Sequence, residues 1–204
     1  MKEIFLIRHG ETEYNKKGIV QGRGVNPPLN EKGRIQADLF FEKYKDELFE
    51  IVYTSTLQRA IESVQKFIDK KIPHEKLSEL DEIGWGELEG REVDDYTRSE
   101  FKRIILEWKN GDSESKTING ESPLELQKKH FRFLDIIQSR PQKKILVCMH
   151  GRALRILLCT LLNKSLSEMD DFPHHNFSLY KVLFDGNEFK LTSLNDLSHL
   201  HVEV

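Results

Sequence analysis

The chain has 204 residues, of which 38% are hydrophobic and 32% are charged, and its formal net charge is -3. This length can bury one substantial core, so we expect a single domain over residues 1–204, and the apolar runs are too short to cross a membrane. A nearly balanced charge excludes the strong basic field of a nucleic-acid or anionic-membrane binder, and we expect a cytoplasmic protein in which any anion site is local.

The first predicted element is a buried strand over residues 3–7, where four consecutive apolar residues precede Arg8 and His9. Ligands gather at the carboxyl ends of parallel strands, so this pair is a candidate anion site. For the pair alone, the alternative is a structural role, with Arg8 at a strand end and His9 in an ordinary hydrogen bond. The run ends in this pair and not in a small-residue cleavage site, so we expect no signal peptide.

Two helices with recognisable N-cap residues are predicted next, with one strand between them. Asn30 is predicted to cap a helix that runs through Tyr44, and either Ser55 or Thr56 is predicted to cap a helix that runs through Ile68. The apolar segment between these helices, residues 51–53, is predicted to form the second strand.

Residues 84–120 interrupt this alternation with glycines, acidic clusters and one helix that carries an aromatic stripe. We expect this insertion to cover the site like a lid. Trp108 has helical spacing with Ile104 and Ile105, so core packing is favoured for its side chain. Trp85 lies in a glycine-flanked loop and is the better candidate for contact with a substrate.

The next helix has the most specific start in the chain. Ser122 is predicted to be its cap, Pro123 its first residue and Glu125 the residue that completes a capping box. A buried strand over residues 145–149 and a very apolar helix over residues 153–162 are predicted to follow.

The last two predicted strands, residues 178–184 and 189–194, flank a turn at Asp185, Gly186 and Asn187. This spacing predicts an antiparallel hairpin at a sheet edge. The alternation of strands and helices along the chain predicts an α/β fold: a three-layer α/β/α sandwich with a mostly parallel sheet and an antiparallel edge.

The two cysteines, Cys148 and Cys159, lie in apolar segments and are predicted to be reduced core residues. A nucleophilic or metal-binding role for Cys148 is a weaker alternative, because no Cys-x-x-Cys pair supports it. The histidine pairs at 174–175 and at 199 and 201 are weak metal candidates, since no set of Cys or carboxylate ligands joins them. We therefore expect no metal site.

Basic and imidazole side chains follow several of the predicted strands. Arg8 and His9 follow the first strand, Arg59 lies in the first turn of the helix after the second, and His150 follows the strand over residues 145–149. Helix amino termini add free N–H donors and a favourable dipole for an anion. These four side chains could therefore converge on one phosphate group.

The chain resembles the histidine phosphatase superfamily, in its phosphoglycerate-mutase-like branch. The matching motifs run in family order over almost the whole chain, which is a more specific signal than a single Arg-His-Gly. They are Arg8-His9-Gly10-Glu11-Thr12 with Asn15, Gln21-Gly22-Arg23 with Pro28-Leu29-Asn30 and Gly33, Thr54-Ser55 with Arg59-Ala60, Glu82 with Gly86 and Glu89-Gly90, Gly120-Glu121-Ser122, and His150-Gly151. The turn over residues 22–29 departs from the family's compact Gly-Arg-x-Asp-x-Pro-Leu, which leaves the direction of Arg23 open.

The resemblance implies that His9 is a nucleophile that forms a phosphohistidine and that Glu82, with Asp81 as an adjacent competitor, is the general acid and base. Burial is expected to keep Glu82 able to donate a proton. The other implied site residues are Arg8, Asn15, Gln21, Gly22, Arg23, Arg59, His150 and Gly151. Arginine forks neutralise a phosphoryl group, and neighbouring cations keep His9 uncharged and reactive. No metal or organic cofactor is expected, because these side chains take over the charge neutralisation.

The predicted function is hydrolysis of a small phosphomonoester, which is also the one partner we expect. Phosphoglycerate mutase is the second reading, and a catalytically silent phosphate-binding module is the third. Mutases of the family tend to carry a basic insertion and a shielding carboxyl-terminal tail. Here four residues follow Leu200, and the insertion is acidic, with Glu87, Glu89, Glu92, Asp94 and Asp95. These features favour the phosphatase.

Overall fold

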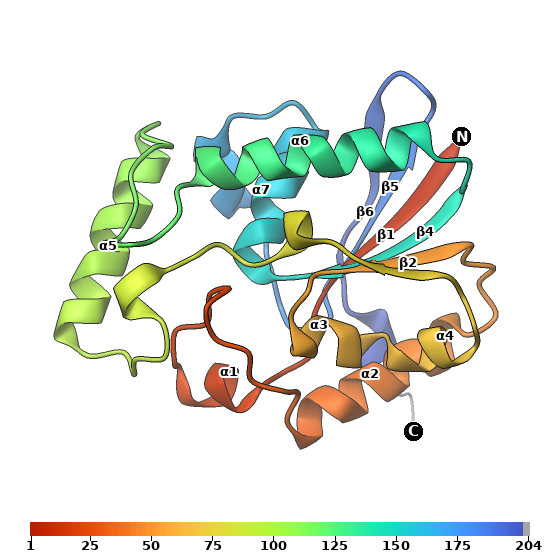
Figure 1. Ribbon diagram of the computed structural model, residues 1–204, viewed down its shortest axis with the longest axis horizontal. Coiled ribbons are helices and arrows are strands. Elements are labelled where there is room, and N and C mark those ends of the chain that lie inside the picture. Colours follow the sequence, from red (N-terminus) through yellow and green to blue (C-terminus); the bar gives the residue numbers. More distant parts are fainter. Residues whose placement is uncertain (202–204) are drawn as a thin grey trace.

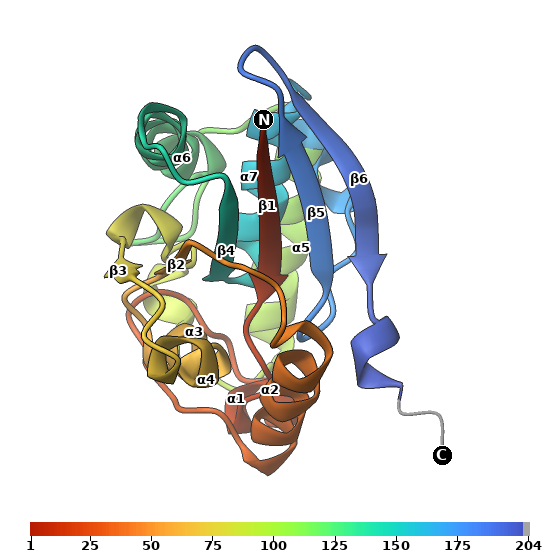
Figure 2. The same cartoon turned by 90° about the vertical axis from the view of Figure 1, so that its right-hand side faces the viewer.

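The computed structural model describes residues 1–201 and is built on one six-stranded sheet with the order β3-β2-β4-β1-β5-β6 (Figures 1 and 2). Strands β1 to β4 run parallel, whereas β5 is antiparallel to both β1 and β6. The predicted mostly parallel sheet with an antiparallel edge is confirmed. The strands are β1 (Lys2–Arg8), β2 (Ile51–Thr54), β3 (His74–Lys76), β4 (Lys144–Met149), β5 (Leu179–Phe184) and β6 (Phe189–Asp196).

Helices cover both faces of this sheet, which gives the predicted three layers (Figure 1). Helices α2, α3 and α4 pack on one face, and α6 and α7 on the other, while α5 extends the second layer beyond the strand ends. The helices are α1 (Glu13–Lys17), α2 (Glu31–Tyr44), α3 (Gln58–Ser63), α4 (Gln65–Asp69), α5 (Asp95–Lys109), α6 (Pro123–Ser139) and α7 (Gly151–Leu161). No helix within residues 1–201 is long and apolar enough to span a membrane.

The central strand β1 is buried on both faces, which explains its uninterrupted apolar run. Phe5 and Ile7 join the core with α2, α3 and α4, whereas Ile4 and Leu6 join the core with α6 and α7. Successive residues of a strand point to opposite faces, so a strand between two helical layers needs apolar residues throughout.

The structure departs from the predicted elements where local signals are weak or contradictory. The sequence of β3 has no apolar pattern, and this segment forms a strand by pairing with β2 at the edge of the sheet. The helix predicted to run through Ile68 breaks at Val64 into α3 and α4. Neither Ser55 nor Thr56 caps α3: its N-cap is Leu57, which has no side-chain capping bond. The predicted caps Asn30 and Ser122 are confirmed.

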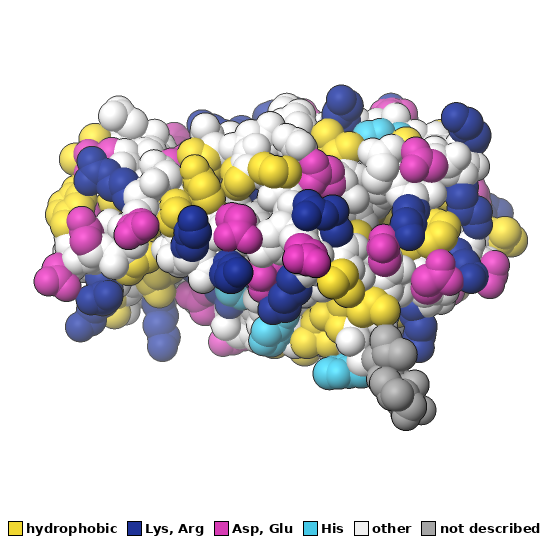
Figure 3. All heavy atoms as spheres, turned by 90° about the horizontal axis from the view of Figure 1, so that it is seen from below, with side chains coloured by type: hydrophobic (Ala, Val, Ile, Leu, Met, Phe, Trp, Pro, Cys, Tyr) yellow, Lys and Arg dark blue, Asp and Glu magenta, His cyan; other side chains and the backbone are white. Residues whose placement is uncertain are grey.

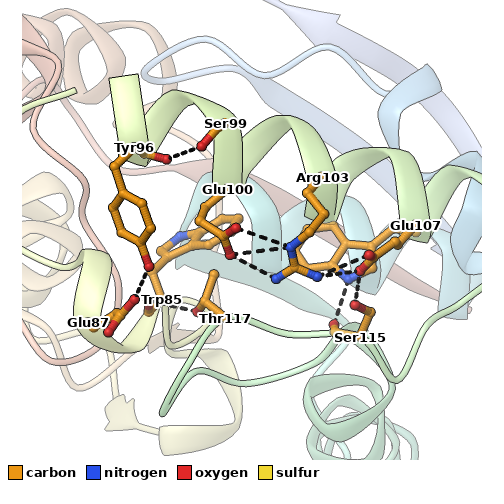
Figure 4. A network of polar contacts seen from close by, with 10 residues as sticks. Trp85, Glu87, Tyr96, Ser99, Glu100, Arg103, Glu107, Ser115 and Thr117 are labelled. Atoms are coloured by element: carbon orange, nitrogen blue, oxygen red, sulfur yellow. Dashed lines mark hydrogen bonds and ion pairs between the residues drawn. The ribbon is translucent and has the colours of Figure 1, made fainter. Parts of the chain in front are cut away.

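The segment over residues 84–120 folds around α5, and its aromatic side chains form part of the core (Figure 4). The ring of Trp85 lies 4.7 Å from that of Phe101 and 5.6 Å from that of Trp108. Thr117 donates a hydrogen bond to the Trp85 carbonyl at 2.8 Å. Trp85 is only 7% exposed and its indole packs in the core as that of Trp108 does, so this packing favours a structural role over the predicted substrate contact.

Basic and acidic side chains alternate over the face of the molecule that carries α1 and α2 (Figure 3). This mixture agrees with the small net charge of -3. A charge-selective site on this protein therefore depends on local geometry and not on a field of one sign.

Candidate active site

The parallel strands bring three segments together at one edge of the sheet. Arg8 of β1 is in register with Met149 of β4, so His9 and His150 each come one residue later. The main-chain N–H of His9 donates to the Met149 carbonyl at 3.0 Å, and the two imidazole rings are 5.1 Å apart. Arg59 reaches the same edge from α3, which follows β2.

The imidazole of His9 is held with one nitrogen available. Its Nδ1 lies 2.7 Å from the carbonyl oxygen of Gly10, which can only accept, so Nδ1 carries the proton. The lone pair is then on Nε2. Burial, reinforced by the charges of Arg59 and Arg8, lowers the pKa of His9 well below its ordinary value. His9 therefore presents a neutral nucleophilic nitrogen.

Two guanidinium groups enclose this histidine without a carboxylate partner of their own. Arg59 is fully buried and donates to the carbonyls of Val25 at 3.0 Å and Gly22 at 3.1 Å. Arg8 donates to the carbonyl of His174 at 3.2 Å. Burial lowers the pKa of each arginine to about 10, so both are cations at neutral pH. Within residues 1–201, neither arginine forms an ion pair, and each leaves its Nε without a partner.

The carboxylate of Glu82 is bound to the first turn of α7. It accepts hydrogen bonds from the main-chain N–H groups of Ile83 at 2.9 Å, Ala153 at 2.8 Å and Arg152 at 3.1 Å. These three donors fix the orientation of the carboxylate at the amino terminus of the helix. The neighbouring Asp81 binds Thr56 instead, through both the N–H and the hydroxyl.

Asn15 is oriented by a chain of polar contacts. Its Oδ1 accepts from the N–H of Thr12 at 3.2 Å and from Nδ2 of Asn176 at 3.3 Å. No hydrogen bond among residues 1–201 involves its own Nδ2, which is therefore available to a ligand. Thr12 also donates to Oε1 of Gln21 at 2.9 Å, which connects Gln21 to this group.

Arg23 is directed to the rim and not to His9. Its Nη1 pairs with the buried carboxylate of Glu121 at 2.7 Å, and Lys129 holds the second oxygen of Glu121 at 2.5 Å. A cavity of about 420 Å³ opens beside Arg23, while the carbonyl of the preceding residue, Gly22, binds Arg59. The cavity is lined by Arg23, Gly24, Gly84, Gly86, Glu87, Glu89 and Asn119.

Several site residues were missed by sequence reasoning because the returning chain brings them in. Asn176 donates to the carbonyl of His9 at 3.0 Å, and Ser63 accepts the N–H of Gly10 at 2.9 Å. Ser55, which belongs to a matching family motif but is given no site role by the sequence, lies 2.7 Å from Nε2 of His150. The ring of His174 lies against Gly151 and leaves no room for a side chain there.

Two of the weaker candidates from the sequence, His199 and Cys148, are buried in the core. His199 packs in the core against Phe40 and Tyr44. Burial raises the pKa of the Cys148 thiol, which makes it a poor nucleophile. Among residues 1–201, no group of three or more His, Cys, Asp or Glu side chains is arranged to hold a metal ion.

The chain is similar to known proteins over most of its length. A family model described as the histidine phosphatase superfamily (branch 1) matches residues 4–197. Phosphoserine phosphatase 1 of Hydrogenobacter thermophilus is 26% identical over 205 residues, covering 98% of this chain and 95% of that protein. The 2,3-bisphosphoglycerate-dependent phosphoglycerate mutase of Bartonella henselae is 31% identical over 172 residues, 78% of this chain and 81% of that one.

The fold is likewise similar to that of a crystallised phosphatase. Phosphoserine phosphatase from Entamoeba histolytica, in complex with 3-phosphoglyceric acid, matches with a TM-score of 0.84 and 28% identity. The match covers 98% of this chain and all of that one. Together with the family model, which spans nearly the whole described chain, this similarity shows that the chain belongs to the histidine phosphatase superfamily.

Proposed function

We propose that the chain hydrolyses a small phosphomonoester through a phosphohistidine on His9. One observation carries this proposal: the buried Arg59 and the half-buried Arg8 are cations that form no ion pair within residues 1–201, next to an imidazole with a free Nε2. Charges removed from water are stabilised by pairing, and a doubly charged phosphoryl group is a suitable partner for both guanidinium groups. Asn15 adds an amide donor to the same group.

The chemistry divides into two displacements at phosphorus. Nε2 of His9 donates its lone pair to phosphorus while the bond to the leaving oxygen breaks, and Glu82 gives that oxygen a proton. Water then attacks phosphorus, Glu82 takes the water proton, and the bond to His9 breaks to release phosphate. Main-chain N–H groups of Ile83, Arg152 and Ala153 orient the Glu82 carboxylate, which supports its role in exchanging a proton with the leaving oxygen and then with water.

A phosphorylated amino acid is the substrate class that the rim favours. The cavity beside Arg23 carries both signs of charge, because Arg23, Glu87 and Glu89 all line it. A leaving group with a carboxylate and an ammonium complements both. Phosphoserine phosphatases among the relatives support O-phosphoserine as the first compound to test.

Phosphoglycerate mutase is the second candidate, because one relative with 31% identity carries that name. The acidic rim disfavours it, since phosphoglycerate brings a carboxylate but no ammonium for Glu87 and Glu89 to bind. Isomerisation of 3-phosphoglycerate in the presence of 2,3-bisphosphoglycerate, at a rate above that of hydrolysis, would reverse the order of the two functions.

The first test is hydrolysis of p-nitrophenyl phosphate in the presence of EDTA. We expect the native chain to turn over, His9→Ala to lose turnover, and His201→Ala, which changes an exposed histidine, to keep it. EDTA should have no effect, because the arginines provide the positive charge. Phosphate binding without any turnover by the native chain would instead indicate the silent binding module.

The same assay then compares O-phosphoserine with 3-phosphoglycerate. We expect kcat/KM to favour O-phosphoserine by about tenfold, the effect of one additional charged hydrogen bond. Glu87→Gln should reduce this preference and leave p-nitrophenyl phosphate turnover unchanged. Equal or higher activity on 3-phosphoglycerate would contradict the proposed substrate class.

A further inference from the structure

The contacts of Ser55 determine which nitrogen of His150 carries a proton. Oγ of Ser55 lies 2.7 Å from Nε2 of His150 and accepts the main-chain N–H of Leu57 at 3.2 Å. The hydroxyl has one proton to donate, and Nε2 is its one acceptor among residues 1–201. If Nε2 instead donated to Oγ, the buried hydroxyl proton would have no acceptor, which buried polar groups avoid.

The other nitrogen of His150 then carries the ring proton. Nδ1 is buried and has no hydrogen-bond partner within residues 1–201. Burial and the nearby charges of Arg59 and Arg8 lower the pKa of His150 well below its ordinary value, so the ring is neutral and its tautomer matters. A neutral imidazole offers an anion either an N–H donor or a repulsive lone pair.

The two histidines are therefore held in complementary states. The bond from Nδ1 to the Gly10 carbonyl leaves His9 with a lone pair on Nε2, and the bond from Ser55 leaves His150 with a proton on Nδ1. Their rings are 5.1 Å apart, close enough to contact one phosphoryl group. One ring can attack phosphorus while the other donates to an oxygen.

We propose that Ser55 is a positioning residue that holds His150 as its Nδ1–H tautomer, so that His150 donates a hydrogen bond to the phosphoryl group. This inference rests on the proposed function for its effect on turnover, but the tautomer itself is a property of the resting protein. Such a donor contributes most as negative charge develops on the transferring group, so its loss should lower kcat more than it raises KM.

The test compares Ser55→Ala with Ser178→Ala by nitrogen-15 NMR of the histidine rings and by p-nitrophenyl phosphate kinetics. Ser178 is a matched control, since its hydroxyl is equally buried but has no hydrogen-bond partner among residues 1–201. We expect His150 to be protonated on Nδ1 in the native chain and in Ser178→Ala, and to become a mixture of tautomers in Ser55→Ala. We expect kcat to fall about 10- to 100-fold in Ser55→Ala only.

Each outcome bears on the proposal. An Nε2–H ring in the native chain would overturn it, as would a Ser55→Ala variant with an unchanged tautomer and unchanged kcat. If Ser55→Ala does not fold, Ser55→Cys, which keeps the volume but is a weak donor, provides the same comparison. Absence of turnover in the native chain would refute the proposed function while the NMR result still decides the tautomer.

Discussion

Arg59 illustrates how single residues are prepared for a charged ligand. Its side chain lies wholly inside the protein, and its guanidinium donates to the main-chain carbonyls of Gly22 and Val25. These neutral acceptors fix the direction of the side chain without cancelling its charge. Glu82 shows the opposite arrangement, since main-chain N–H groups fix a carboxylate. Backbone dipoles therefore position both charges and leave them available.

Side chains pack so closely around Gly151 that the effect of adding one methyl group there can be predicted. A Cβ there would lie 2.6 Å from Cδ2 of His174 and 3.3 Å from Nε of Arg8, so Gly151→Ala must displace both. We expect kcat/KM for p-nitrophenyl phosphate to fall about 10- to 100-fold, as displaced catalytic groups do. At Gly84, a Cβ would meet Arg23 at an ordinary 3.5 Å, so Gly84→Ala should keep most of its turnover. Equal activity in the two variants would argue against this packing.

Sequence motifs predicted the candidate site residues that follow strand ends. They did not predict the residues that a distant loop brings to the site when it folds back. Arg8, His9, Arg59 and His150 follow strand ends, so the sheet alone brings them together. Their partners depend on loops, as when residues 174–176 fold back over Arg8 and His9. Composition also misleads in a loop, because glycines beside Trp85 suggested exposure where α5 in fact buries the ring.

At the scale of the elements, capping residues predicted the starts of α2 and α6, where the side chain of the cap bonds to the first turn of the helix. Ser122 and Glu125 exchange hydrogen bonds as predicted at the start of α6. The predicted start of α3 is wrong because Ser55 binds the N–H of Leu57 and contacts His150, while Thr56 binds Asp81, so the helix begins only after Leu57. Strand β3 could not be predicted, since three residues without apolar alternation become a strand only when β2 lies beside them.

The capping box at α6 gives a stability prediction. We expect Ser122→Ala to reduce the free energy of unfolding by about 1 kcal/mol, because the N–H of Glu125 loses its acceptor. Within residues 1–201, the hydroxyl of Ser139, at the exposed end of the same helix, bonds only to the carbonyl of Ile136, so Ser139→Ala should have a smaller effect. Urea unfolding of both variants measures the difference. Equal losses would mean that the box does not stabilise the helix start.

At the scale of the whole molecule, six histidines have lowered pKa values because the fold buries them wholly or in part. The pKa values of His130, His174 and His199 are about 3, 2 and 4, and those of His9, His74 and His150 are also lowered. The unfolded chain, with histidine pKa values near 6.5, therefore binds more protons than the folded protein below that pH. Stability is greatest above about pH 6.5 and is lost as the pH falls.

Thermal unfolding between pH 7.5 and pH 5 tests this linkage. Each buried histidine should remove on the order of 1 kcal/mol per pH unit below about 6.5. His130 lies in the core and neither of its nitrogens has a partner among residues 1–201. His130→Leu should therefore make stability less dependent on pH without changing turnover. A variant with the native pH dependence would show that His130 is protonated in the folded state.

The register of β1 against β4 also has a consequence for assembly. His9 and His150 follow strands that are more than 130 residues apart in the sequence by their numbering, and they face each other because Arg8 pairs with Met149. A slip of one residue would turn one histidine toward the opposite layer of helices. The two histidines lie far apart in the sequence, so recovery of turnover during refolding reports that this long-range pairing has formed in the correct alignment.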